Sequence, residues 1–470
     1  MIRCPCLLLI SLVSLLWPSV SKGRAADQPN FIFMLSDDQG WNGLSVAMHP
    51  DVAGSKGEIF HTPNLEKLAA QGMRFSSAYA PAPVCSPTRI SIQTGKSPAQ
   101  LHWTKAAPAV SGRKLIEPRL IKDLNQNEVT IGELLKKAGY ATAHYGKWHI
   151  AGGGPGAHGY DEHDGDTGNE NAFKFTDPNP VDIFGMAERA AKFMEKSQRV
   201  GKPFYIQLSW NALHAAELAN KATLAKYEKL ATNNAKQVAT AAITEDLDSG
   251  VGKVLEAVEQ LGLSENTYII YMSDNGAGGG GRRGGLSGGK GSVWEGGIRV
   301  PLIVRGPKVT ANSWCHAPVV GYDFLPTLCA LAGVPAKELP KDIEGGDITS
   351  LLHNSGEGVV KRQREELVFH FPHYQSDDGP HSAIRVGNLK LIHFYEDNRV
   401  ALFDLAKDIG EREDIAQQMP KDVQELKGRL DQYLAAINAQ LPTSNPNFDP
   451  SQPVAPRKGG KNRKQGTDKK

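Results

Sequence analysis

The chain has 470 residues, of which 40% are hydrophobic and 22% charged, a composition typical of a soluble protein with a buried core. The formal net charge of +2 is concentrated at the ends, because residues 1–26 hold three basic and no acidic residues, and residues 457–470 hold seven basic residues and one acidic residue. The body between them is therefore acidic, so we expect no nucleic-acid partner, and an anionic ligand would need a local cluster of cations.

The N-terminus predicts a cleavable signal peptide over residues 1–26. Arg3 precedes an apolar run, Leu7–Trp17, and the small residues Ala25 and Ala26 follow near a cleavage point. The run is too short to span a bilayer, so we expect no membrane span. The protein is expected to be secreted or periplasmic.

The next 340 or so residues alternate between strand and helix patterns. Five apolar runs predict strands: Asn30–Ser36, Tyr140–Tyr145, Phe204–Ser209, Thr267–Ser273 and Pro301–Val304. Five amphipathic stretches predict helices: Asn64–Gln71, Ile131–Ala138, Ile183–Lys196, Ala239–Leu261 and Asp323–Ala332. Strands that are apolar on both faces and alternate with helices indicate a mostly parallel sheet, covered by helices on both sides.

A second, smaller unit is predicted after about residue 365. Three short runs at 382–386, 389–395 and 400–404 indicate an antiparallel sheet, and the apolar stripe from Val423 to Ile437 indicates a helix. From residue 441 on, Pro, Asn, Lys and Gly predominate, which favours disorder. We therefore predict a signal peptide (1–26), a main domain (27–365), a small C-terminal domain (366–440) and a disordered basic tail (441–470).

Polar residues follow two of the predicted strands at their carboxyl ends. Asp37 and Asp38 follow the first strand, and Asp274 and Asn275 follow the strand at 267–273. Either pair alone is more often a helix cap or a turn. Because ligands bind beyond the carboxyl ends of parallel strands, the two pairs together predict a metal site. Three carboxylates and an amide suit a hard cation such as calcium or magnesium.

Basic residues follow two other predicted strands at the same edge. Lys147 and His149 follow the strand at 140–145, and His214 follows the strand at 204–209. A buried structural histidine is the alternative for His214. Its place at the active edge of the sheet favours a functional role.

Cys85 is predicted at a helix N-terminus, because Pro87 suits the first helical turn. Arg89 would lie about one turn further on, able to face the same site. Cys85 is either a buried structural cysteine or a reactive thiolate, although a thiolate is a poor match for a hard cation. Cys315 and Cys329 either pair or are both buried thiols, and in each case Cys85 is left over.

Cys85-Ser86-Pro87-Thr88-Arg89 followed by Thr94-Gly95 is the signature of the type I, arylsulfatase-like sulfatases of the alkaline phosphatase superfamily. The chain resembles that family from about residue 28 to 415. Further segments resemble its motifs in order: Asn30–Gly40, Gly146–His149, Ser273–Gly276, Gly288–Gly291 and Trp294–Pro301.

The resemblance implies an alkaline-phosphatase-like α/β domain, with a mostly parallel sheet sandwiched by helices, and a small C-terminal α+β domain. It implies a sulfuric ester hydrolase in which a formylglycine-generating or sulfatase-maturing enzyme converts Cys85 to formylglycine (3-oxoalanine). One Ca²⁺ would be held by Asp37, Asp38, Asp274, Asn275 and an oxygen of the modified Cys85.

The resemblance also assigns catalytic roles. One hydroxyl of the hydrated aldehyde would attack sulfur, and loss of a proton from the other would release sulfate. Lys147 and Lys290 would neutralise the sulfate charge, and Arg89 would support the hydrate. His149 would be the base, and His214, alone or together with Lys290, would protonate the leaving oxygen.

Two positions depart from the family pattern. Many relatives have Pro where this chain has Leu213, which puts the turn before His214 in question. Ile409 stands where the family turn that resembles Asp404–Asp408 continues with Pro. The second change concerns stability more than chemistry.

Two other functions fit the same residues less well: a phosphomonoester or phosphonate-ester hydrolase, and a non-enzymatic binder of sulfated glycans in which Cys85 is never oxidised. The substrate is expected to be a sulfated carbohydrate or an aryl sulfate. The Gly-rich segment Gly276–Gly285 is either a mobile loop near the substrate or an ordinary solvated loop. Six loop residues could line a sugar pocket, although ordinary surface placement is favoured for each: Trp103, Lys105, His158, His163, His370 and His373.

Overall fold

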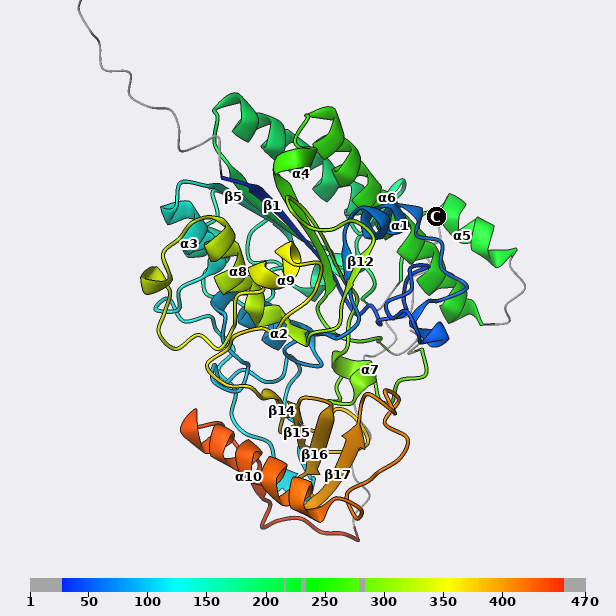
Figure 1. The fold of residues 1–470 in the computed structure, drawn as a ribbon. Coiled ribbons are helices and arrows are strands. Elements are labelled where there is room, and N and C mark those ends of the chain that lie inside the picture. The colour runs from blue at the N-terminus through cyan, green and yellow to red at the C-terminus, as the bar shows by residue number, and fades with distance from the viewer. Residues whose placement is uncertain (1–27, 215–216, 230–233, 279–283, 452–470) are drawn as a thin grey trace, which may run out of the picture.

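An eight-stranded sheet forms the centre of the molecule in the computed structural model, which describes residues 28–214, 217–229, 234–278 and 284–451 (Figure 1). Its order is β12-β2-β11-β10-β1-β9-β5-β6. The strands are β1 (Asn30–Ser36), β2 (Met73–Phe75), β5 (Ala141–Gly146), β6 (Glu162–His163), β9 (Phe204–Ser209), β10 (Thr267–Ser273), β11 (Leu302–Arg305) and β12 (Ser313–Cys315). From β10 to β6 neighbouring strands are parallel, whereas β11 is antiparallel to β10 and β2. The prediction of a mostly parallel sheet is confirmed.

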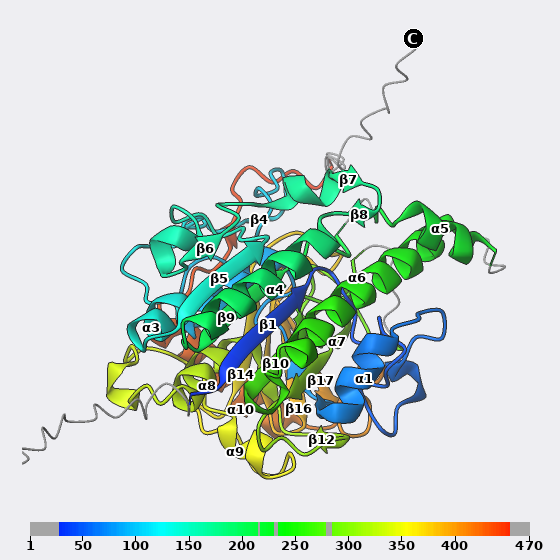
Figure 2. The ribbon, with the colours of Figure 1, turned by 90° about the horizontal axis from the view of Figure 1, so that it is seen from above.

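Helices cover both faces of this sheet. Successive side chains of β1 point to opposite faces and are apolar on both, so each face must be covered. Ile32 and Met34 pack with α1, α4 and α6, while Phe31, Phe33 and Leu35 pack with α2, α3, α8 and α9 on the opposite face (Figure 2). The helices of the first face are α1 (Pro63–Gln71), α4 (Ile183–Arg199) and α6 (Ala235–Gln260), with α5 (Lys221–Glu228) beside α6. Those of the second face are α2 (Cys85–Thr94), α3 (Ile131–Lys137), α8 (Phe324–Leu331) and α9 (Thr349–His353).

Helix α3 shows how local sequence fixes an element. The side chain of Thr130 accepts from the backbone N–H of Glu133, and the carboxylate of Glu133 accepts from the N–H of Thr130, which is a capping box. Past the end of the helix, Gly139 has a φ of 96°, a conformation that suits glycine. The predicted helix therefore begins at the expected residue and ends one residue early.

A four-stranded antiparallel sheet and a helix form the C-terminal part (Figure 1). Its elements are β14 (Leu367–Phe371), β15 (His381–Val386), β16 (Leu389–Phe394), β17 (Arg399–Asp404) and α10 (Pro420–Ala436). The predicted stripe of α10 packs on one face of the sheet through Leu426, Leu430 and Leu434. The other face packs against Val293 and Ile298, close to the main sheet.

Two features of the C-terminal region differ from the expectation. β14 was not predicted from the sequence. The expectation of disorder from residue 441 on does not hold for β18 (Thr443–Ser444), which pairs with β4 (Leu115–Ile116). Residues 452–470 and the predicted signal peptide lie outside the described residues, and the domain limits stay predictions.

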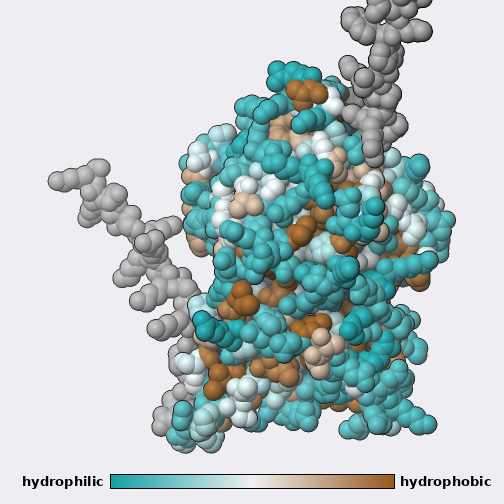
Figure 3. Space-filling model, turned by 90° about the vertical axis from the view of Figure 1, so that its left-hand side faces the viewer, coloured by the Kyte–Doolittle hydropathy of each residue, from teal (hydrophilic) through white to brown (hydrophobic). Residues whose placement is uncertain are grey.

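The remaining elements are short: β3 (Ala78–Tyr79), β7 (Phe175–Thr176), β8 (Asn179–Pro180), β13 (Val319–Val320) and α7 (Glu295–Ile298). Cys315 and Cys329 are buried free thiols, so the second of the two alternatives for them holds. On the face shown in Figure 3, hydrophilic residues predominate and hydrophobic ones are interspersed among them. Within the described ranges no helix has the length and apolarity needed to cross a bilayer.

Candidate active site

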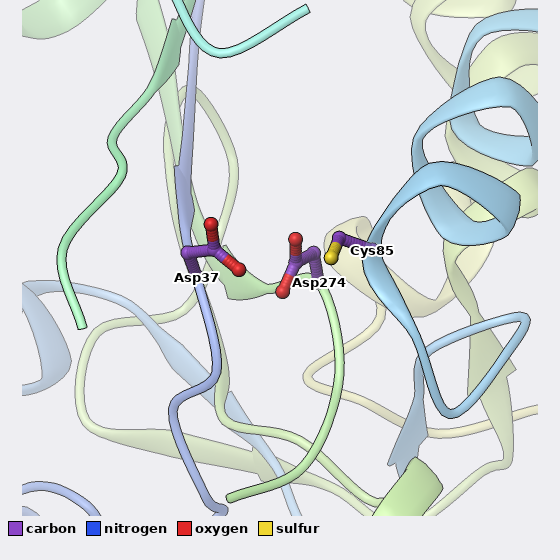
Figure 4. A group of neighbouring side chains, drawn as sticks. All are labelled: Asp37, Cys85 and Asp274. Atoms are coloured by element: carbon purple, nitrogen blue, oxygen red, sulfur yellow. The ribbon is translucent and has the colours of Figure 1, made fainter. Parts of the chain in front are cut away.

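The ends of β1 and β10 bring two carboxylates together with Cys85. The two strands are parallel and in register to their last residues, so Asp37 and Asp274 leave the sheet side by side. Cys85, the first residue of α2, faces them, and one ligand atom of each residue lies within 4.8 Å of the other two (Figure 4). All three side chains are buried. The predicted meeting of residue 85 with these carboxylates at one edge is therefore present.

Each acidic group of the site is paired with a cation. The Nζ of Lys147 lies 2.5 Å from an oxygen of Asp37, and the Nζ of Lys290 lies 2.6 Å from an oxygen of Asp38.

Arg89 connects three parts of the site from one turn along α2. It donates to Asp274 Oδ2 from Nε at 3.0 Å and from Nη2 at 2.7 Å. It also donates to the carbonyl of Lys147 at 2.7 Å. The helix that carries Cys85 is thereby tied to β10 and to the segment after β5.

Burial and charge set the protonation states of these groups. Burial by itself would raise the pKa of Asp37, but Lys147, Arg89, His214 and Lys290 together hold it well below its usual range. Burial also raises the pKa of the Cys85 thiol, although Lys147 and Lys290 oppose the shift. An unmodified Cys85 would thus be a protonated thiol, which gives no support to a reactive thiolate.

The donor set fits a hard cation. Asp37 Oδ1 and Asn275 Oδ1 are buried and have no hydrogen-bonding partner among the described residues. The amide of Asn275 donates from Nδ2 to Asp38 at 2.8 Å, so its oxygen remains as an acceptor. Burial and the nearby charge of Asp37 raise the pKa of Asp274 to about 6, a repulsion that a divalent cation would relieve. Buried oxygen acceptors without donors are the ligands that Ca²⁺ prefers.

The two predicted histidines lie at the same edge. His149 Nδ1 is 3.1 Å from Ser86 Oγ, and burial, reinforced by Lys147 and Arg89, lowers the pKa of His149 to about 3. His214 has a buried Nδ1 without a partner in the described part of the chain, and burial lowers its pKa as well. It directly follows a turn that is hydrogen-bonded to the backbone of Asp37.

Leu213 keeps the turn before His214 attached to the site. Its backbone N–H donates to the carbonyl of Asp37 at 2.8 Å, and the N–H of Asp37 donates to the carbonyl of Ala212 at 2.8 Å. A proline at position 213 would lack the first of these bonds. The departure from the family pattern therefore adds a link between the turn and β1.

The interpretation of the six loop residues as ordinary surface residues is wrong for five of them. Trp103, Lys105, His158, His370 and His373 are buried, and only His163 is exposed. The buried Glu117 explains two of these positions, because it pairs with Lys105 Nζ at 2.9 Å and with His373 Nδ1 at 2.8 Å. A single sequence holds no signal for such packing between loops.

Two further points concern the residues singled out from the sequence. Ser86 stood out only as part of the cysteine motif, and its contact with His149 was missed. Arg282 and Arg283, at the centre of the Gly-rich segment, lie outside the described residues.

Two family models and many known proteins match this chain. The sulfatase family model matches residues 29–334, and the model for the N-sulphoglucosamine sulphohydrolase C-terminal region matches residues 289–440. Human arylsulfatase A is 28% identical over 497 aligned residues, which cover 91% of this chain and 90% of that protein.

Solved structures share the fold. Ps i-CgsB in complex with k-i-k-neocarrahexaose has a TM-score of 0.72 and 23% identity, covering 87% of this chain and 93% of that one. BT4656 in complex with D-glucosamine-2-N,6-O-disulfate has a TM-score of 0.67 and 22% identity, covering 87% and 98%. The sulfatase model spans more than half of the chain and includes all the residues of the site described above. The chain belongs to the type I sulfatase family and is a sulfatase, an enzyme that hydrolyses sulfate esters.

Proposed function

We propose that this sulfatase acts through a formylglycine made from Cys85 and one Ca²⁺, on a sulfated carbohydrate or an aryl sulfate. The observation that carries the proposal is the group of Asp37, Cys85 and Asp274, three buried residues whose ligand atoms lie within 4.8 Å of one another. Cations surround this group on several sides, as an anionic substrate requires. A structural cysteine would have no need of such neighbours.

The four predicted oxygen donors would hold the Ca²⁺. Asp37, Asp38, Asp274 and Asn275 come from two adjacent strand ends, with residue 85 opposite. When bound, the ion would act as a Lewis acid and orient the sulfate oxygens. The unpartnered oxygens of Asp37 and Asn275 support this assignment among the described residues.

The modified side chain explains why a cysteine stands at the nucleophile position. A hydrated aldehyde supplies two hydroxyls on one carbon, so one can attack sulfur and the other allows sulfate to leave. A serine would remain as a stable sulfate ester. The guanidinium of Arg89 lies on the same helix and fixes the cysteine-bearing turn against Asp274.

Lys147 and Lys290 provide the positive charge that a sulfate ester needs. Both are held by carboxylates of the site, Lys147 by Asp37 and Lys290 by Asp38. A sulfate group entering the pocket would meet both amines already oriented, without a further cost of ordering them.

The histidines would move the protons. His149 has a pKa of about 3, so its ring is neutral at physiological pH and can accept a proton. His214 would give a proton to the leaving oxygen, together with Lys290. Burial lowers its pKa in the free enzyme, and an anionic sulfate beside the ring would oppose that shift.

Solved structures with the same fold and the N-terminal sequence support the substrate class and the location. Two of these structures hold k-i-k-neocarrahexaose and D-glucosamine-2-N,6-O-disulfate, which supports a sulfated carbohydrate. The sequence of residues 1–26 supports export, as a secreted or periplasmic protein that a formylglycine-generating or sulfatase-maturing enzyme modifies.

The peptide that spans Ala80–Arg89 provides the direct test. In active protein we expect a mass about 18 Da below that of the thiol peptide, because oxidation to the aldehyde replaces the thiol. Cys85→Ala should abolish release of sulfate from 4-nitrophenyl sulfate, whereas Cys315→Ala, at a buried thiol elsewhere, should remain active. An unaltered peptide mass in active enzyme would refute the nucleophile assignment.

A further inference from the structure

Residues 287–299, here called the lysine loop, connect Lys290 to the cysteine-bearing segment. The Nζ of Lys290 lies 2.6 Å from a carboxylate oxygen of Asp38. The N–H of the next residue, Gly291, donates to the carbonyl of Pro83 at 2.8 Å, two residues before the nucleophile position. Any displacement of the lysine loop would therefore move Lys290 relative to the sulfate pocket.

The other side of the lysine loop is held by side chains of the C-terminal part. The Nζ of Lys390 lies 2.8 Å from Glu295 Oε1 and 2.7 Å from Glu411 Oε1. The N–H of Glu295 donates to Glu411 Oε2 at 2.7 Å, and the N–H of Val293 donates to His381 Nε2 at 2.9 Å. In Figure 1, α7, which begins at Glu295, lies between the main sheet and strands β14–β17.

Three further groups complete a buried charge cluster around Glu295. Its Oε2 accepts from Arg299 Nε at 2.6 Å and from the hydroxyl of Tyr79 at 2.9 Å, and Arg385 donates to the same hydroxyl. Glu295, Lys390 and Glu411 are at most 4% exposed.

Such a cluster is not required for stability alone. Burying paired charges costs free energy that well-packed apolar residues would not cost. Hydrogen bonds between charged groups are directional, so those made to Glu295 hold its carboxylate in one orientation. A role in placing the lysine loop accounts for their presence at this junction.

We propose that Glu411 and Lys390 are positioning residues that hold Glu295 and thereby place Lys290 in the active site. The inference rests on the function proposed for Lys290. Glu411 acts on the lysine loop in two ways. One of its oxygens accepts from the N–H of Glu295, and the other faces Lys390, which in turn pairs with the side chain of Glu295. With Gln at position 411, an NH2 group could replace the oxygen that faces Lys390. This group cannot accept from the ammonium, so the loop would lose part of its anchor.

The same geometry makes the anchor sensitive to pH. Burial raises the pKa of Glu411 to about 7, with a further contribution from Glu295 and against the effect of Lys390. Three charged groups face Glu411: Lys390 on β16, Glu295 on α7, and Arg299, the first residue after α7. Tyr79 and Arg385 do not contact Glu411 directly and are connected to it through Glu295. The anchored form therefore binds a proton on Glu411 more tightly than an open form in which this carboxyl meets water and has its ordinary pKa of 4.5. We expect the anchor to weaken as the pH rises through about 7.

Hydrogen–deuterium exchange of the full-length protein tests the inference without relying on activity. Glu411→Gln should speed exchange in peptides covering 287–299 by about tenfold at pH 8. The matched control is Glu366→Gln, which removes the charge of another C-terminal glutamate, one that pairs with Arg429 at 2.6 Å and does not touch the lysine loop. In wild type, exchange in the same peptides, corrected for the intrinsic effect of pH, should fall between pH 8 and 6, because protonated Glu411 favours the anchored form, and the Gln variant should show no such step.

Kinetics separate positioning from folding. With 4-nitrophenyl sulfate we expect kcat/KM of Glu411→Gln to fall about tenfold at pH 8, with an unchanged melting temperature, and that of Glu366→Gln to stay within about twofold. Equal exchange in all three proteins would overturn the inference, as would equal acceleration in both variants. If wild type does not hydrolyse the ester, the proposed function fails, while the exchange result still decides whether Glu411 anchors the loop.

Discussion

Ser86 and His149 form a pair whose geometry matters for proton transfer. Burial keeps the His149 ring neutral above a pKa of about 3, so it carries one proton. As a base acting through Nε2, the ring needs that proton on Nδ1, which faces Ser86 Oγ at 3.1 Å. Ser86 would accept it and fix both the tautomer and the ring orientation.

Replacing Ser86 by Ala should therefore slow the chemical step rather than substrate binding. We expect kcat with 4-nitrophenyl sulfate to fall about tenfold while KM changes less than about twofold, and Ser86→Thr to restore most of the rate. Ser91→Ala on the same helix is the control, because the buried Ser91 Oγ has no partner among the described residues. An unchanged kcat for Ser86→Ala would show that Ser86 does not position His149.

At the scale of single residues, the sequence predicts the positions that are set by strand ends and by the cysteine motif. Asp37 and Asp274 could be placed together because parallel strands share an edge. Glu411 could not be connected to Lys290, because the contact depends on how two distant parts of the chain pack. The burial of His373 was missed for the same reason.

Helix α1 depends on a carboxylate from another element. Asp248 on α6 accepts from the N–H of Asn64 at 3.1 Å and from the N–H of Leu65 at 2.8 Å, so it satisfies the first turn of α1. Burial raises the pKa of Asp248 from 3.8 to about 6 even though these bonds oppose the shift. The folded protein therefore holds a proton at this site more tightly than the unfolded chain.

Stability from a raised carboxyl pKa is fully present below pH 3.8 and is lost as the pH rises through 6. The free energy of unfolding of wild type, compared with that of Asp248→Asn, should thus fall by about 2 kcal/mol between pH 4 and pH 7. Urea unfolding at both pH values measures this difference.

Asp431→Asn provides the control, because Asp431 is exposed and pairs only on its own helix with Lys427. Its difference from wild type should stay nearly constant over the same pH range. A difference that likewise stays constant for Asp248→Asn would contradict the assignment of this titration to Asp248.

Among the elements, those with a clear pattern were predictable and the short ones were not. β1 and β10 read as buried strands because both of their faces are apolar. β11 was also predicted, but its antiparallel direction depends on the path of the chain after α7. β14 has five residues and no alternation of apolar and polar side chains, so it resembled a loop segment.

At the scale of the whole molecule, the proposed function needs a single divalent ion between the strand ends and residue 85. Removing the ion should leave Asp37 and Asp274 repelling each other in a buried pocket, so the melting temperature should fall in EDTA and recover when Ca²⁺ is added. Residues 457–470 lie outside the described residues, and we expect their deletion to leave activity nearly unchanged.

The calcium content of the purified protein tests the central claim most directly. Elemental analysis after dialysis should find about one Ca²⁺ per chain in wild type and almost none in Asp37→Asn. This variant lacks one of the negatively charged carboxylates that would hold the ion. The control Asp431→Asn should retain the ion. Wild-type protein that hydrolyses sulfate esters without bound Ca²⁺, or equal calcium in wild type and Asp37→Asn, would contradict the account.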